Sequence, residues 1–552
     1  MLFMRIGNMF LTALSATLTC AGLLFNAGAA GGAEAVAIQY HFSGASDLAA
    51  NTNFDRSKQI FNLPPSRHFV DLVLDRLTGI YANALQFAPG GDSAAQLRPM
   101  LGDLLQAESM GSFGGHDKAR MDFVLAARLD EKGAAAWEKH LEAALHSSGE
   151  PLTAEGFSGR VWNRPGNNSL WILRARDWTV AGRGEDLLPV RTEYLQNIKQ
   201  DNRPRPVMKG SWLSAEVDWP LLATWAPLSN CPLKLARTIV DVTASGGRMR
   251  VTAYVTYPED LPWQAEPWRI PKGLVSSPLS SFTASRNLAA LLNPIGALSR
   301  LSSQPLTNQL FCWALREMPL ASYGAWPVMD ATNIVRKLGA GAPAVFNPML
   351  AASGTALNWI PQANRLSWLR LPLTAPVLEP AHDKSGDFLL AKMFPMEPKF
   401  AKASDELWSQ FEQRDDVVYY DWELTGLRLM QWRVLTELLP VFQPPATKDA
   451  ARRQKAVQNA KPPAPGNTAQ TPLAVTEGWL SILSTPVLGN TVTEVTRTSA
   501  TELTVVRNSQ FLFTGLELVL LSHWLADAPV GPLDYSLLPR AKMSGPGLPP
   551  AH

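Results

Sequence analysis

The stretch Asp416-Val417-Val418-Tyr419-Tyr420-Asp421-Trp422-Glu423-Leu424, followed by Thr425-Gly426-Leu427, decides the fold of this chain. Valine, tyrosine and tryptophan are typical of a half-buried strand. Side chains alternate along a strand, so one face is expected to carry Val418, Tyr420, Trp422 and Leu424. The other face is expected to carry Val417, Tyr419, Asp421 and Glu423. Thr425 suits a helix N-cap. A helical stripe is then predicted from Leu427, Met430, Val434, Leu435 and Leu438.

The same order of elements occurs earlier in the chain. Residues 211–218, a helix and a hairpin over 239–257 match residues 416–424, a helix and the pair 491–498 with 501–508. Both strands carry carboxylates two residues apart, Glu216 with Asp218 and Asp421 with Glu423, and residues 282–290 echo residues 42–50. We therefore predict an α+β fold of two similar domains from a diverged duplication, with mixed or antiparallel sheets and packed helices.

Composition places the domain boundaries. A segment rich in proline and tryptophan, residues 258–278, is predicted to link an amino-terminal domain (36–257) to a carboxy-terminal domain (279–538). Residues 443–472 are rich in proline and poor in large apolar side chains, so we expect a disordered insertion there. The tail, residues 539–552, is also expected to be disordered.

The first 30 residues have the pattern of a secretory signal peptide. Arg5 precedes an apolar run, and Ala27-Gly28-Ala29-Ala30 offers small residues for cleavage. We predict export to the periplasm or beyond the cell, with an uncleaved amino-terminal helical anchor as the alternative. No later segment contains eighteen uninterrupted apolar residues, so no membrane span is expected after cleavage.

The charge balance argues against nucleic acid as a partner. Fifty basic and 48 acidic residues give a net charge of +2, without the basic excess that nucleic-acid binding requires. Cys231 and Cys312 remain after signal cleavage. In an oxidising compartment they are candidates for a disulfide, and the alternative is that each is a separately buried small hydrophobic residue.

Three segments resemble parts of large exported bacterial proteins of unknown function. They are the strand Asp-Val-Val-Tyr-Tyr-Asp-Trp-Glu, the Phe-Ser-Gly-Ala-Ser run that begins at Phe42, and Asn308-Gln309-Leu310-Phe311-Cys312-Trp313-Ala314-Leu315. The resemblance implies an exported α+β protein of bacterial origin, and it supplies no catalytic residues to transfer.

Sequence motifs of common enzymes are missing. The chain contains no G-x-S-x-G, S-x-x-K, Walker or H-E-x-x-H motif. None of its eight histidines has paired metal-ligand spacing. No metal site or cofactor is predicted, and whether the protein is an enzyme stays open, with a non-catalytic role favoured.

Asp421 and Glu423 are the best acid–base candidates. Two residues apart on a strand, their side chains share one face about 7 Å apart, a separation that resembles the carboxylate pair of a glycosidase. The favoured alternative is a solvent-facing strand edge that carries two charges.

Trp263 and Trp268 are candidate binding residues, because exposed aromatic rings stack on sugars or anchor a protein partner. The alternative is that they wedge the two domains together. The function predicted is an exported non-catalytic binding or structural component of the bacterial cell envelope, with an envelope protein or a glycan as partner. The alternatives are a carbohydrate-acting hydrolase that uses Asp421 and Glu423, and a glycan-binding module that uses exposed tryptophans.

Overall fold

The structure is a computed structural model that describes residues 36–526, apart from 86, 88–91, 116–121, 165–168, 209, 226–233, 265, 288–307, 317–320, 352–353, 372–373, 395–400, 439–471 and 485–487. The predicted signal peptide (1–30), the tail (539–552) and residues 443–471 of the predicted insertion lie outside the described residues. Pro472, the last residue of that insertion, begins helix α16 (Pro472–Leu483).

Twenty described strands form one sheet, and every described pair is antiparallel. From the centre toward one end the order is β10 (Arg248–Thr256), β9 (Arg237–Ser245), β8 (Leu213–Asp218), β1 (Val36–Phe42), β2 (Ser109–Gly114), β3 (Asp122–Arg128), β7 (Trp178–Arg183), β6 (Leu170–Ala175), β5 (Phe157–Trp162) and β4 (Glu150–Ala154).

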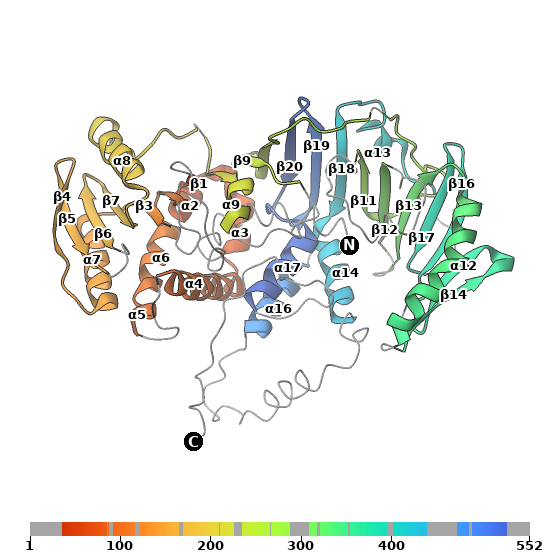
Figure 1. The fold of residues 1–552 in the computed structure, drawn as a ribbon, viewed down its shortest axis with the longest axis horizontal. Coiled ribbons are helices and arrows are strands. Elements are labelled where there is room, and N and C mark those ends of the chain that lie inside the picture. The colour runs from red at the N-terminus through yellow and green to blue at the C-terminus, as the bar shows by residue number, and fades with distance from the viewer. Residues whose placement is uncertain are drawn as a thin grey trace, which may run out of the picture.

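The other half of the sheet repeats this order. From the centre it runs β20 (Glu502–Ser509), β19 (Asn490–Arg497), β18 (Val417–Leu424), β11 (Leu279–Arg286), β12 (Gln309–Leu315), β13 (Ser322–Val328), β17 (Gly386–Lys392), β16 (Val377–Asp383), β15 (Arg365–Leu369) and β14 (Ala356–Ile360). The strands β10 and β20 pair and join the halves. Figure 1 shows the amino-terminal half in red to yellow and the other half in green to blue.

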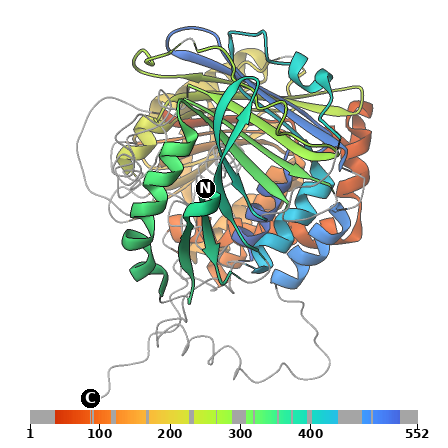
Figure 2. The ribbon, with the colours of Figure 1, turned by 90° about the vertical axis from the view of Figure 1, so that its right-hand side faces the viewer.

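Most helices cover one face of the sheet, which we call the helix face. In the amino-terminal half they include α4 (Pro64–Ala84), α6 (Leu97–Gln106) and α7 (Glu131–Leu145). Near the centre, α14 (Thr425–Leu438), α16 and α17 (Gly515–Leu525) lie beside α4 (Figures 1 and 2). The opposite, outer face is covered by α8 (Leu188–Asp201) at one end and α13 (Asp405–Ser409) at the other.

The strand and helix predicted from residues 416–427 are confirmed as β18 and α14. The predicted alternation is broken at the start of β18 by a bulge opposite β19, between Val417 and Tyr419. The extra residue turns Val417 to the outer face, beside Tyr420. The predicted helical stripe is wrong in part, because Met430 is 39% exposed while Leu429 is fully buried.

The hairpin predicted over residues 239–257 is confirmed. Gly246 and Gly247 connect β9 to β10 with φ of 58° and 77°. Two consecutive positive φ angles match the right-handed twist of the flanking strands, and glycine adopts them without a steric cost.

Residues from both halves share one core cluster on the helix face. Phe69 of α4 stacks on Trp479 of α16, with ring centroids 3.8 Å apart. The indole N–H of Trp479 donates to Ser66 Oγ at 3.0 Å. The predicted linker, residues 258–278, lies outside the regular strands, and it buries Leu261, Ile270 and Val275. The two halves are therefore packed against each other as well as hydrogen-bonded.

Two sequence matches between the halves are not structural equivalents. Phe42 ends β1 and packs on the helix face, whereas Phe282 lies inside β11 and packs on the outer face. Asp218 is the last residue before helix α9 (Trp219–Trp225), and Leu424 is the last before α14. The carboxylate pairs are thus offset by one residue, which places them on opposite faces of the sheet.

Candidate functional site

Asp421 and Glu423 lie in the interior of the sheet. Their strand β18 is paired on both sides, with β11 and with β19. Both side chains point to the helix face, beneath α14 and α17, and Glu423 is only 5% exposed. The favoured interpretation of a solvent-facing strand edge is therefore wrong, because the neighbouring strands and the two helices enclose the pair.

Each carboxylate has a specific donor. The hydroxyl of Thr283 on β11 donates to Asp421 Oδ1 at 2.6 Å. The backbone N–H of Gly515, at the first residue of α17, donates to Glu423 Oε1 at 2.8 Å. A carboxylate at a helix N-terminus also benefits from the helix dipole.

A buried ion pair lies next to the carboxylates. Arg507 on β20 donates from Nη1 and Nη2 to the two carboxylate oxygens of Glu517, at 2.7 and 3.0 Å. These side chains are 4% and 0% exposed. Glu517 also accepts from the N–H of Thr514, which completes a capping box on α17. The pair is bidentate and satisfied on both sides, as a buried ion pair requires.

Together with Arg428, these residues form what we call the charge cluster: Asp421, Glu423, Glu517, Arg428 and Arg507. Burial raises the pKa of Asp421 to about 6. Burial, followed by the nearby charge of Asp421, raises the pKa of Glu423 to about 8. Burial also lowers the pKa of Arg428, whose guanidinium lies 4.8 Å from the ring centre of Trp432. With three acidic and two basic members, one proton on Glu423 makes the cluster neutral.

The corresponding positions of the amino-terminal half are apolar. Counting back from the helix that follows each strand, Ala215 and Val217 of β8 correspond to Asp421 and Glu423. Thr493 and Arg507 likewise correspond to Val240 and Ala253, which pair with each other on β9 and β10. All four residues of the amino-terminal set are buried. The charge cluster is thus a property of one half only.

The rings of Trp263 and Trp268 are partly buried, and an arginine guanidinium lies over each ring. Arg497 lies 5.6 Å from the ring centre of Trp263, and Arg286 lies 4.6 Å from that of Trp268. Trp263 donates its indole N–H to the carbonyl of Ala500 at 3.1 Å, and Trp268 packs into the outer-face core. Trp263 packs against a core cluster with residues of both halves, which fits the wedge interpretation, whereas Trp268 packs within the carboxy-terminal half alone. Partner binding by these rings stays a prediction.

Cys231 lies outside the described residues. Cys312 on β12 has no disulfide partner among the residues that the structure describes, and burial raises the pKa of its thiol to about 12. The pairing of Cys231 with Cys312 therefore stays a prediction. The raised pKa keeps the thiol protonated and makes it a poor nucleophile.

Within the described part of the chain, no three or more histidine, cysteine, aspartate or glutamate residues come together as a metal site would need. No helix in the same residues is both long and apolar enough to cross a membrane.

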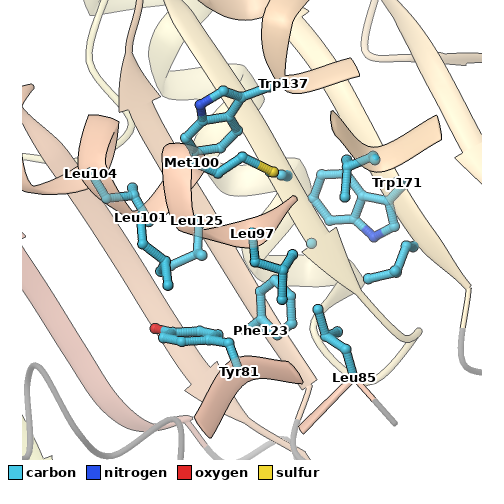
Figure 3. A pocket seen from close by; sticks show the side chains of 14 residues that line it. Tyr81, Leu85, Leu97, Met100, Leu101, Leu104, Phe123, Leu125, Trp137 and Trp171 are labelled. Atoms are coloured by element: carbon cyan, nitrogen blue, oxygen red, sulfur yellow. The ribbon is translucent and has the colours of Figure 1, made fainter. Parts of the chain in front are cut away.

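An apolar cavity of about 60 Å³ lies in the amino-terminal half, and it is partly open to the surface. Figure 3 shows the side chains of α4, α6 and α7 meeting those of β3, β6 and β7 around it. Its lining consists of Tyr81, Leu85, Leu97, Met100, Leu101, Leu104, Phe123, Leu125, Trp137, Leu141, Leu170, Trp171, Ala181 and Gly182. The cavity is several times larger than the roughly 10–15 Å³ that a void needs to hold one water molecule.

Polar contacts fix the walls of the cavity from outside. Trp137 of α7 donates its indole N–H to Asp103 Oδ2 of α6 at 2.9 Å, which ties these two helices together. On the sheet side, Ala181 of β7 is small and leaves space, whereas the ring of Trp171 covers Gly182. This site was not predicted from the sequence, because each wall alone has the pattern of an ordinary core. The one available signal was the small side chain of Ala181 in this strand.

Comparisons with known proteins give little. The sequence matches no protein-family model and no curated protein. One solved structure that it resembles, described as crystal form III of TP0453, has 11% sequence identity and a TM-score of 0.21. The match covers 43% of this chain and 78% of that chain. A likeness at this score does not inform fold or function.

Proposed function

We propose that this protein is an exported, non-catalytic binding component of the bacterial cell envelope, and that its ligand occupies the apolar cavity between α4, α6, α7 and the sheet. The observation that carries the proposal is the cavity itself. The cavity is lined almost entirely by apolar side chains and opens in part to the surface, and concave, mostly apolar sites are where proteins bind apolar small molecules.

The charge cluster supports a structural role for Asp421 and Glu423 rather than the hydrolase alternative. A glycosidase requires both carboxyl groups to reach a sugar from opposite sides of the scissile bond. Here one carboxylate is bonded to Thr283 and the other to Gly515, under two helices. Both carboxyl groups are engaged in hydrogen bonds within the fold.

The experiment is a titration with N-phenyl-1-naphthylamine, an uncharged probe whose fluorescence rises in apolar surroundings. The full-length protein is expected to bind it in a saturable way. Ala181→Leu places a larger side chain in the cavity wall and should weaken binding at least tenfold, because the added atoms occupy the space of the probe.

The matched control is Ala391→Leu, the same substitution on β17 in the other half. It should leave probe binding unchanged. The proposal is wrong if a folded protein shows no saturable binding, or if both variants bind as tightly as the wild type.

We also propose that the two halves arose by duplication and diverged in role. The shared strand order supports this, and so does the place of α7 and α12 (Ala331–Leu350), each between the third and fourth strands of its half. One half then keeps an apolar helix face with a cavity. The other carries the charge cluster.

A further inference from the structure

One end of the molecule, formed by α12, β14 and β15, lacks acidic side chains. Residues 331–378, which we call the acid-free segment, contain no aspartate and no glutamate. Their four basic residues are Arg336, Lys337, Arg365 and Arg370. Arg365 pairs at 2.7 Å with Glu379, which follows the segment. The segment as a whole therefore keeps a positive charge.

The opposite end of the molecule has a different composition. The corresponding elements of the amino-terminal half, α7, β4 and β5, span residues 131–162 and contain five glutamates. Figure 1 shows these elements at one end of the molecule and α12 with β14 at the other. The fold does not require an end without acids, so the difference belongs to the carboxy-terminal half alone.

Large apolar side chains are exposed at the same end. Val345 on α12 is 58% exposed, and Leu369, the last residue of β15, is 41% exposed. The amide of Asn347 on α12 donates to the carbonyl of Leu357 at 3.0 Å and accepts from its N–H at 2.7 Å. Leu357 pairs with Trp368, the residue before Leu369. Val345 and Leu369 therefore both lie near the carboxy-terminal end of α12.

The exposed face of α12 changes along the helix. Its second turn exposes Arg336 and Lys337. Beyond that turn, the exposed residues of the helix are small or aliphatic: Ala340, Gly341, Ala344, Val345 and Pro348. A face that begins basic and continues apolar matches a surface in which anionic head groups lie over an apolar layer.

From this arrangement we infer that the end formed by α12, β14 and β15 binds the surface of a lipid bilayer that contains anionic phospholipids. Val345 and Leu369 enter the apolar layer beneath the head groups, and Arg336 and Lys337 pair with lipid phosphates. The inference does not depend on the apolar cavity or on its ligand.

Two other occupants fit this end less well. Protein partners are held by large anchors in matched pockets, whereas the apolar side chains that α12 exposes are small or aliphatic. Addition of a strand from a second copy would need free backbone groups on β14, the last strand of the sheet. The two hydrogen bonds from Asn347 already use those of Leu357.

The experiment is co-sedimentation of the full-length protein with lipid vesicles. One set of vesicles is phosphatidylcholine alone, and the other is equal parts of phosphatidylcholine and phosphatidylglycerol. We expect about tenfold tighter binding to the anionic vesicles, because each cation near an anionic surface contributes roughly fivefold in affinity. Added salt should weaken that preference. Replacing Arg336 and Lys337 together by glutamine should remove most of it.

Ala344→Asp tests whether the apolar part of α12 meets the bilayer. It should weaken binding to the anionic vesicles about fivefold, because the new charge opposes the lipid phosphates. The matched control is Ala135→Asp, the same substitution at an exposed position of α7. It should bind as the wild type does. Both positions are exposed, so both variants are expected to fold.

Three results would overturn the inference. They are no binding of the wild type to anionic vesicles, an unchanged affinity in Ala344→Asp, and an equal loss in Ala344→Asp and Ala135→Asp. Binding through the predicted signal peptide alone would give the second result, because every variant carries that segment. Self-association of the wild type in analytical ultracentrifugation without lipid, lost in Ala344→Asp, would instead make this end an interface between two copies.

Discussion

Glu423 holds a proton at neutral pH in the folded protein. Its ordinary pKa of 4.5 is raised to about 8, first by burial and then by the charge of Asp421. Between these two values the folded protein binds more protons than the unfolded chain. The contribution of Glu423 to the free energy of unfolding is therefore largest below pH 4.5. That contribution falls as the pH rises from 4.5 through about 8. Asp421 acts in the same direction between pH 3.8 and about 6.

Glu423→Gln should remove most of this dependence. The amide is neutral at every pH and its oxygen still accepts from Gly515, so at pH 9 the variant is expected to be more stable than the wild type by about 1–3 kcal/mol. Urea unfolding at pH 5, 7 and 9 measures the free energies. Glu412→Gln, at an exposed ion pair with Lys272, is the control and should keep the slope of the wild type. Parallel pH profiles for wild type and Glu423→Gln would contradict the argument.

At the scale of single residues, the predicted proximity of Asp421 and Glu423 is confirmed, and the solvent-facing environment predicted for them is wrong. The two-residue spacing correctly predicted Asp421 and Glu423 on one face. Their burial depends on Arg507 and on α17, which lie far along the chain and approach only because β19 and β20 pair. The local sequence around Asp421 and Glu423 cannot predict a contact with residues so far along the chain. For the same reason, the cavity residues showed only core periodicity.

Helices α14 and α17 approach each other closely at one glycine. A Cβ on Gly515 would lie 2.4 Å from the backbone nitrogen of Leu429, and a backbone atom cannot move aside as a side chain does. Gly515→Ala should therefore lower the free energy of unfolding by about 2 kcal/mol. Thermal or urea unfolding measures the loss.

Gly478→Ala in α16 is the matched control with the opposite sign. A Cβ there meets nothing within 4 Å. Alanine is the better helix former, so the variant should gain about 0.5–1 kcal/mol. Equal losses at both glycines would show that helix contact is not the cause.

Elements with one dominant face were predictable from the sequence. The hairpin of β9 and β10 appears within residues 239–257, where the order of elements placed it, to within two residues. The stripe on α14 failed because this helix packs on the sheet and on α17 at once. Its buried set includes Leu429, Gln431 and Thr436, and a helix buried from two directions has no single stripe to find.

The whole molecule should unfold as one unit. The halves share the β10–β20 ladder and the core cluster that joins α4 to α16 and α17. Two signals can follow urea unfolding: N-phenyl-1-naphthylamine bound in the amino-terminal half, and far-ultraviolet circular dichroism of the whole molecule. Gly515→Ala, in the carboxy-terminal half, is expected to lower the urea midpoint of both signals by the same amount. A shift seen by only one of the two signals would show that the halves unfold separately.

The arrangement of the halves was beyond sequence reasoning. Their shared order of elements was visible, but the pairing of β10 with β20 joins residues far apart in the chain. One continuous sheet and two separate sheets have the same local patterns. Only the exposed or buried state of an edge strand distinguishes them, and that state is a property of the assembled molecule.

The β10–β20 ladder also means that β10 is synthesised well before the strand that pairs with it. Strand β20 begins about 250 residues after β10 ends, and ribosomes add roughly 5–20 residues per second. For about 10–50 s the edge of β10 has been made and its partner has not. An unpaired strand edge such as that of β10 pairs readily with another chain. A factor that shields nascent strands should therefore raise the yield of this protein most when it acts within that interval.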